Sequence, residues 1–175
     1  MTKIINLYGS PSSGNSTTAA HLFALMKQNG AEVELVTEFA KELVWDERHS
    51  MFTEQDYIFA KQNHKLRRLH NKVDFVITDS PLLLGIFHIP PEFPGASHFV
   101  EYVKATYDSY NNTNIFLNRT TPYNPIGCNQ TEEQSARLGR DIHSYLNINH
   151  YIDYEYDVEK DVAEMIFMDV IPSII

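Results

Sequence analysis

Two glycines separated by four residues stand between an apolar run and a helix, and they restrict the fold of this chain more than any other feature. The segment Gly9-x-x-x-x-Gly14-Asn15-Ser16 matches the pattern G-x-x-x-x-G-K-[ST] at every fixed position except the lysine. In such a loop, backbone N–H groups and the N-terminus of the following helix point at phosphate oxygens. We therefore predict a phosphate-binding loop, although a plain Gly- and Ser-rich turn is the alternative. Its predicted members are Gly9, Ser12, Ser13, Gly14, Asn15, Ser16 and Thr17, with the Ser16 hydroxyl on Mg²⁺.

Asn15 is the one irregular position of this motif. A lysine usually places its charge between the β- and γ-phosphates of a bound nucleotide. Asparagine offers a hydrogen bond but no charge, and the missing charge could cost several kcal/mol of transition-state stabilisation. Three explanations remain open: the chain is weakly active or inactive, another cation substitutes, or the parent chain carries lysine here.

Apolar runs of strand length alternate with helix-length segments along the whole chain. This alternation predicts an α/β fold with a mainly parallel sheet, and 175 residues suffice for one domain over residues 1–175. Segment 81–94 is Pro-rich and is predicted to be a structured loop. The predicted strands are residues 4–8, 32–37, 73–78, 113–118 and 151–155, and the predicted helices are residues 16–29, 38–45, 53–71, 96–109, 131–147 and 158–170.

Composition limits the partners and the compartment. The formal net charge is −9, which disfavours a polyanion as a partner. No apolar run approaches the ~20 residues that span a bilayer, so we expect no membrane partner. The single cysteine, Cys128, cannot form an internal disulfide, and we expect a cytoplasmic protein.

The phosphate loop and three further segments resemble a known family. These segments are residues 37–43 (TEFAKEL), 78–81 (TDSP) and 122–125 (PYNP). Together they are similar to small P-loop kinases, in particular the nicotinamide-riboside-kinase domain and its phage-encoded relatives. The resemblance implies a five-stranded parallel sheet in the order 2-3-1-4-5, flanked by helices and closed by a short lid. It also implies ATP and Mg²⁺, and a hydroxyl on a nucleoside- or nucleotide-like acceptor.

Two carboxylates follow predicted strands, at the sheet edge where ligands of such folds bind. Glu38 directly follows the second strand, and similar kinases have an acidic residue here that accepts the proton of the acceptor hydroxyl. Asp79 ends the third strand, where a carboxylate holds Mg²⁺ directly or through water. Glu38 and Asp79 are therefore candidates for base and metal holder, and the two roles could be exchanged. Helix capping by Glu38 and turn formation by Asp79 are the structural alternatives.

Three arginines are candidates for the missing positive charge. Arg119 opens the polar segment of residues 119–130, which would be the lid, and Arg137 and Arg140 share one face of the next helix. Lid arginines often contact the γ-phosphate, so we expect one of the three to act in catalysis. A surface ion pair, for instance between Arg137 and Asp141, is the alternative.

A basic stripe is predicted along the helix of residues 53–71. Its members are Lys61, Lys65 and Arg68, continued by Lys72, and Tyr57 extends it by one turn. It could dock a phosphate or a DNA strand, with Tyr57 stacked on a base, or it could be a solvated helix face.

Three functions follow from these features. The favoured one is an ATP-dependent kinase for a nucleoside- or nucleotide-like acceptor. The second makes the acceptor a hydroxymethylpyrimidine base in phage DNA, bound through Lys61 to Lys72. The third is a nucleotide-binding protein that has no catalytic activity because Asn15 replaces the usual lysine.

Overall fold

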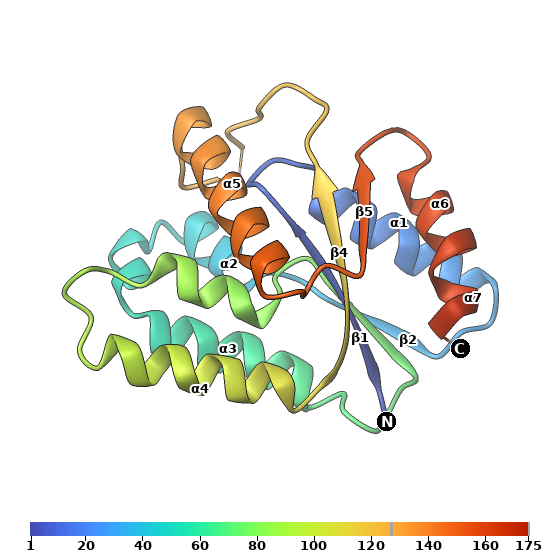
Figure 1. Ribbon diagram of the computed structural model, residues 1–175, viewed down its shortest axis with the longest axis horizontal. Helices are drawn as coiled ribbons and strands as arrows, with labels where there is room; N and C mark the ends of the chain where they lie inside the picture. Colours follow the sequence, from blue (N-terminus) through green and yellow to red (C-terminus); the bar gives the residue numbers. More distant parts are fainter. Residues whose placement is uncertain (127, 175) are drawn as a thin grey trace.

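A five-stranded parallel sheet forms the centre of the molecule (Figure 1). The computed structural model describes residues 1–126 and 128–174, the last of these by its backbone alone. The strand order is β2-β3-β1-β4-β5 and every paired strand is parallel, as the family resemblance implied. The strands are β1 (Lys3–Gly9), β2 (Val33–Val36), β3 (Phe75–Thr78), β4 (Asn111–Asn118) and β5 (Tyr154–Asp157).

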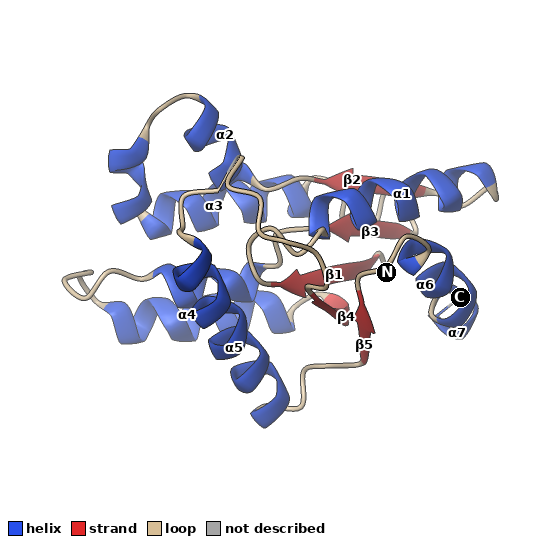
Figure 2. Ribbon diagram, turned by 90° about the horizontal axis from the view of Figure 1, so that it is seen from above, coloured by secondary structure: helices blue, strands red, loops and turns tan. Residues whose placement is uncertain are grey.

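Helices cover both faces of this sheet (Figure 2). One face carries α1 (Asn15–Gln28), α6 (Val162–Asp169) and α7 (Ile171–Ile174), which share a hydrophobic core with the strands. A second core joins the opposite face to α3 (Gln55–Arg67), α4 (Ala96–Asp108), α5 (Glu132–Ile148) and the 3₁₀ helix η2 (Leu82–His88). Because both faces are covered, β1 is buried along almost its whole length and β3 throughout.

Two further elements lie beyond the carboxyl end of β2. They are α2 (Phe39–Trp45) and the 3₁₀ helix η1 (His49–Thr53), which lead the chain into α3. Residues 119–131 connect β4 to α5 and pass close to the phosphate loop. The predicted helix start after this segment is confirmed: Thr131 and Gln134 form a capping box that fixes the beginning of α5.

Three predicted boundaries differ from the structure by three residues or more, each because a tertiary contact overrides the local pattern. The predicted strand 151–155 begins only at Tyr154, since residues 151 and 152 pack into the second core as a connection. The predicted helix 53–71 spans only α3, and Thr2 accepts a hydrogen bond from the N–H of Asn71 in the turn that follows. The last predicted helix begins at Val162, because the Val158 N–H extends the edge of the sheet to the Asn118 carbonyl.

One further prediction needs refinement. Segment 81–94, expected to be a loop throughout, contains η2 over residues 82–88.

Within the described residues, no helix combines the length and apolarity that crossing a membrane requires.

Candidate active site

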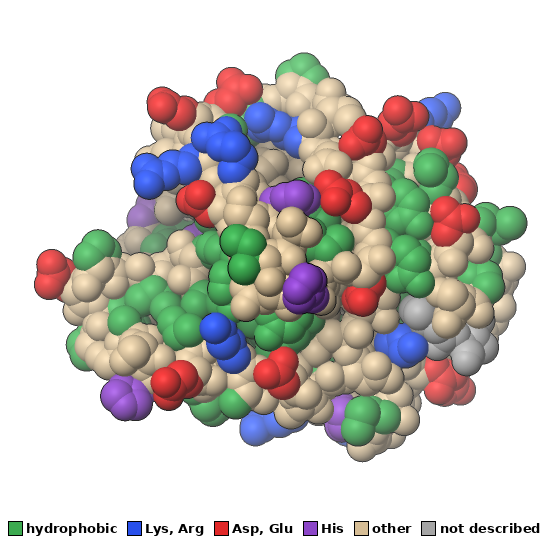
Figure 3. All heavy atoms as spheres, in the orientation of Figure 1, with side chains coloured by type: hydrophobic (Ala, Val, Ile, Leu, Met, Phe, Trp, Pro, Cys, Tyr) green, Lys and Arg blue, Asp and Glu red, His purple; other side chains and the backbone are tan. Residues whose placement is uncertain are grey.

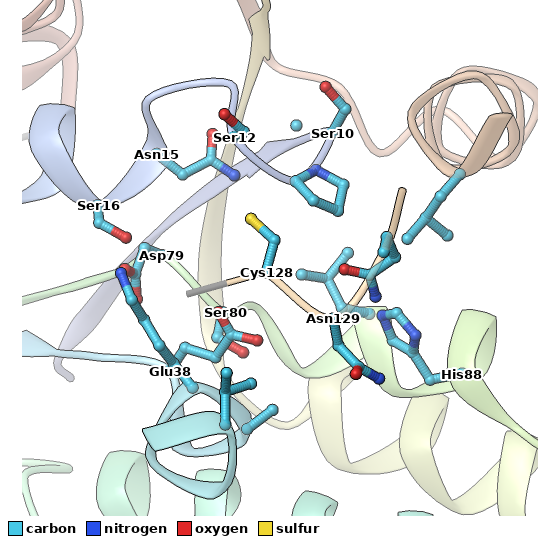
Figure 4. A pocket seen from close by; sticks show the side chains of 18 of the residues that line it. Ser10, Ser12, Asn15, Ser16, Glu38, Asp79, Ser80, His88, Cys128 and Asn129 are labelled. Atoms are coloured by element: carbon cyan, nitrogen blue, oxygen red, sulfur yellow. The ribbon is translucent and has the colours of Figure 1, made fainter. Parts of the chain in front are cut away.

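A cavity of about 620 Å³ opens at the carboxyl ends of the central strands. The phosphate loop, α2, α3, η2, α5 and side chains from residues 121–126 and 128–130 form its walls. Figure 4 shows Ser16, Asp79 and Glu38 toward one side of the cavity and His88 toward the other. This is the place where doubly wound parallel sheets bind their ligands.

The phosphate loop has the backbone shape that an anion site needs. Ser12 and Gly14 have positive φ angles of 65° and 93°, and the Ser13 N–H closes the turn on the Ser10 carbonyl at 3.0 Å. No side chain caps the N-terminus of α1. The N–H groups of its first turn, which lack intrahelical partners, therefore remain available to a phosphate group. Gly9 is required sterically, because a Cβ there would lie 2.8 Å from the Leu117 carbonyl oxygen.

The Asn15 side chain is turned back onto its own loop. The Ser13 hydroxyl donates a hydrogen bond of 2.8 Å to the side-chain oxygen Oδ1 of Asn15. Ser13 itself is almost fully buried. This position therefore contributes a neutral amide whose side-chain oxygen is engaged within the loop.

Glu38 and Asp79 line the same cavity as the phosphate loop. Burial, reinforced by the negative charge of Asp79, raises the pKa of Glu38 from 4.5 to about 7, against the lowering effect of Lys41 and Lys65. Asp79 is 7% exposed, and its Oδ1 atom is buried without a hydrogen-bond partner among the described residues. A buried carboxylate oxygen left in this state is suited to a cation or a ligand donor.

The residues present fit Mg²⁺. Within the described residues, no three His, Cys, Asp or Glu side chains gather at metal-binding distance. Mg²⁺ usually keeps several waters and binds through one or two protein groups together with substrate phosphates. The free Asp79 oxygen and the Ser16 hydroxyl, both lining the cavity, would be those protein groups.

The three predicted arginines lie away from this cavity. Arg119 and Arg140 line a separate, shallower depression beside β4 and α5. Arg119 is stacked on Tyr123 and lies 3.8 Å from Glu132, while one of its guanidinium nitrogens is buried without a partner among the described residues. Arg137 is exposed and lies 3.9 Å from Asp141. Figure 3 shows the resulting group of basic side chains over α5.

The predicted basic stripe also lies outside the cavity. Lys65 forms an ion pair with Glu42 and a 3.3 Å hydrogen bond to the Thr37 carbonyl, and Lys61 sits over the Tyr57 ring at 5.4 Å. Arg68 and Lys72 are exposed beyond them. None of these five residues, Tyr57 included, lines the cavity that holds Glu38 and Asp79.

The lid segment is folded onto the phosphate loop. The Asn124 N–H donates to the Ser12 hydroxyl at 2.8 Å, and the Ser135 hydroxyl donates to the Pro11 carbonyl at 2.7 Å. Cys128 also lines the cavity. The loop and α5 approach so closely that a Cβ on Gly139 would lie 2.7 Å from Ser10 Cβ.

Several cavity residues were not singled out from the sequence, among them Lys41, Gln55, Gln62 and His88. Lys41 stands three positions after Glu38, so it shares its helix face, and this spacing could have revealed it. Gln55 and Gln62 carried no such signal, because they reach the cavity only through the packing of α3 against η2.

Several solved structures share the architecture of this chain. Shikimate kinase from Acinetobacter baumannii in complex with shikimate matches with a TM-score of 0.56 and 13% identity, over 99% of this chain and 94% of that chain. Deoxyadenosine kinase from M. mycoides with bound dCTP matches with a TM-score of 0.61 and 16% identity, over 97% of this chain and 99% of that one. No protein-family model and no curated protein sequence matches the chain. The likeness establishes the fold alone, an α/β fold with a five-stranded parallel sheet that these two kinases share.

Proposed function

We propose that this protein is an ATP-dependent phosphotransferase that acts on a hydroxyl of a nucleoside- or nucleotide-like acceptor. The observation that carries the proposal is that a phosphate loop and two carboxylates with distinct environments open onto one cavity. Phosphoryl transfer depends mainly on positioning and on electrostatic stabilisation, and these elements supply both.

Glu38 is the proposed base. With a pKa of about 7, its carboxylate can take a proton from a hydroxyl near neutral pH. The acceptor oxygen forms a bond to the γ-phosphorus, the bond from that phosphorus to the bridging oxygen breaks, and ADP leaves. The proton of the acceptor hydroxyl goes to a Glu38 oxygen and is later released to solvent.

Asp79 and Ser16 are the proposed holders of Mg²⁺. When bound, the ion would neutralise charge on the β- and γ-phosphates. The first-turn N–H groups of α1 would donate hydrogen bonds to the phosphate oxygens. Asp79 has a second role that needs no ion, since its negative charge raises the pKa of Glu38.

The part of the cavity beyond Glu38 suits a ring-shaped acceptor. Apolar side chains from α3, η2 and α5 line it, with the amide groups of Gln55 and Gln62 among them. Burial lowers the pKa of His88, so this ring is neutral at pH 7. The fold-sharing proteins bind shikimate and dCTP, and the apolar wall here favours a nucleoside over a polar, carboxylated ring.

The test is a transfer assay with γ-labelled ATP and Mg²⁺. Nucleosides, shikimate and hydroxymethylated DNA are offered separately to the natural chain and to Glu38→Gln. Glu42→Gln is the matched control, because Glu42 is an exposed carboxylate on the same helix that pairs with Lys65. We expect the natural chain to transfer phosphate to a nucleoside. Glu38→Gln should abolish this activity, and Glu42→Gln should retain it.

The same assay separates the alternatives. Transfer to DNA alone would replace the nucleoside acceptor with a DNA base. ATP binding without transfer to any acceptor, also in an Asn15→Lys variant, would overturn the proposed function and leave a nucleotide-binding protein.

A further inference from the structure

The phosphate loop of this chain lacks a positive charge where phosphoryl transfer needs one. Asn15 is neutral, and its side-chain oxygen is engaged by the Ser13 hydroxyl. Negative charge spreads over the equatorial oxygens of the transferring group, so a nearby cation contributes to the rate. A chain that catalyses the proposed reaction therefore needs a cation from another element.

Lys41 is the one lysine or arginine that lines the cavity among the described residues. It lies in the first turn of α2, one helical turn after Glu38, and is partly buried. The Arg119, Arg137 and Arg140 side chains that sequence reasoning favoured do not line this cavity.

The Lys41 ammonium is also uncommitted. Within residues 1–126 and 128–174, no carboxylate lies within ion-pair distance of it, and its side chain makes no hydrogen bond. Its neighbour Lys65, by contrast, is held by Glu42 outside the cavity. The Lys41 charge does act within the site, since it lowers the pKa of Glu38.

We propose that Lys41 supplies, from α2, the positive charge on the transferring phosphoryl group that the phosphate loop of this chain does not provide. This inference rests on the proposed function. It makes Lys41 a catalytic residue that contacts the γ-phosphate, and it explains how a loop with Asn15 can belong to an active enzyme.

A double-mutant cycle tests the proposal, with Lys41→Gln made in the natural chain and in an Asn15→Lys background. We expect Lys41→Gln to lower kcat by roughly 100-fold in the natural chain and much less when lysine occupies position 15, because one cation then replaces the other. Lys41→Arg should retain most of the rate. Lys27→Gln is the matched control, since Lys27 is exposed in the last turn of α1 outside the cavity and should leave kcat unchanged in both backgrounds.

Nucleotide binding decides the question independently of turnover. Calorimetry with Mg²⁺ and a non-hydrolysable ATP analogue should show that Lys41→Gln weakens binding about tenfold in the natural chain, with a smaller loss in the Asn15→Lys background and little loss for ADP. If no variant transfers phosphate, the proposed function fails, and this binding cycle still decides the role of Lys41. Equal losses in both backgrounds, or equal losses for ATP analogue and ADP, would overturn the role proposed for Lys41.

Discussion

At the residue scale, Glu38 carries a perturbed carboxylate that links activity to stability. Its pKa is about 7 in the folded protein, against 4.5 for the ordinary side chain. Burial is the main cause, and the charge of Asp79 adds to it. The folded protein therefore holds this proton more tightly than the unfolded chain does, which is the opposite of the usual behaviour of a paired carboxylate.

The sign of the stability effect follows from that difference. Below pH 4.5 Glu38 is protonated in the folded and the unfolded protein, so its ionisation does not lower the free energy of unfolding. Above pH 7 it is charged in both states, and the cost of burying that charge lowers the free energy of unfolding. We expect Glu38→Gln to raise the free energy of unfolding at pH 8, by ~3 kcal/mol at most, and to change it little at pH 4. Thermal unfolding across this pH range measures the effect, with Glu42→Gln as the control. A gain of the same size at pH 4 would contradict it.

Asp79 offers a second test at this scale. Its Oδ1 atom is buried and lacks a partner among the described residues, so Asp79→Asn should leave the fold intact while removing the proposed metal ligand. We expect a loss of transfer of roughly 100-fold or more and a weaker response to added Mg²⁺. Asp74→Asn, an exposed carboxylate just before the other end of β3, should change neither. An unchanged Mg²⁺ dependence in Asp79→Asn would remove this residue from the site.

At the element scale, the contact between α5 and the phosphate loop holds the loop in shape. Ser135 binds the Pro11 carbonyl, and Gly139 allows Ser10 to approach the helix. In an ordinary helix, alanine in place of glycine would stabilise by about 1 kcal/mol. Here the added methyl group meets Ser10 at 2.7 Å, so overpacking opposes that gain.

We expect Gly139→Ala to destabilise the protein by about 1–3 kcal/mol and to weaken ATP binding, because the loop must shift away from α5. Chemical denaturation and nucleotide titration measure the two effects. Gly85→Ala is the matched control, since its methyl group would make an ordinary 3.7 Å contact with Phe59. A Gly139→Ala protein that is more stable and binds ATP normally would show that the contact is not required.

The elements also show how far the sequence could lead. The sequence motif predicted a loop between a strand and a helix at residues 9–16, and the apolar runs indicated the strands, because both signals are local. The lining of the acceptor end depends on how η2, α3 and α5 pack, and η2 itself lies in a segment expected to be a loop. The place of the Gln55 and His88 side chains in the cavity lining therefore follows from the packing of the folded chain.

At the scale of the whole molecule, the net charge of −9 is a sum over charged side chains that are unevenly distributed along the chain. This distribution bears on whether the acceptor is a nucleoside or a base in DNA. The basic side chains of α3 lie outside the cavity, and one of them, Lys65, is neutralised by Glu42. Electrostatic attraction to a DNA strand depends on several free cations that release counterions together.

The double charge reversal Lys61→Glu with Arg68→Glu tests this choice. Because both residues are exposed and lie outside the cavity, we expect kcat/KM for a nucleoside to change by less than about twofold, the residual effect of screened charges. Fluorescence anisotropy of a labelled hydroxymethylated strand, followed from low to physiological salt, should show weak binding that the reversal barely alters. If the natural chain instead binds the strand tightly, with a steep salt dependence that the reversal abolishes, DNA is the acceptor and the α3 stripe is its docking surface. Glu42→Gln sharpens the comparison, since it frees Lys65 and should strengthen DNA binding only if the stripe is used.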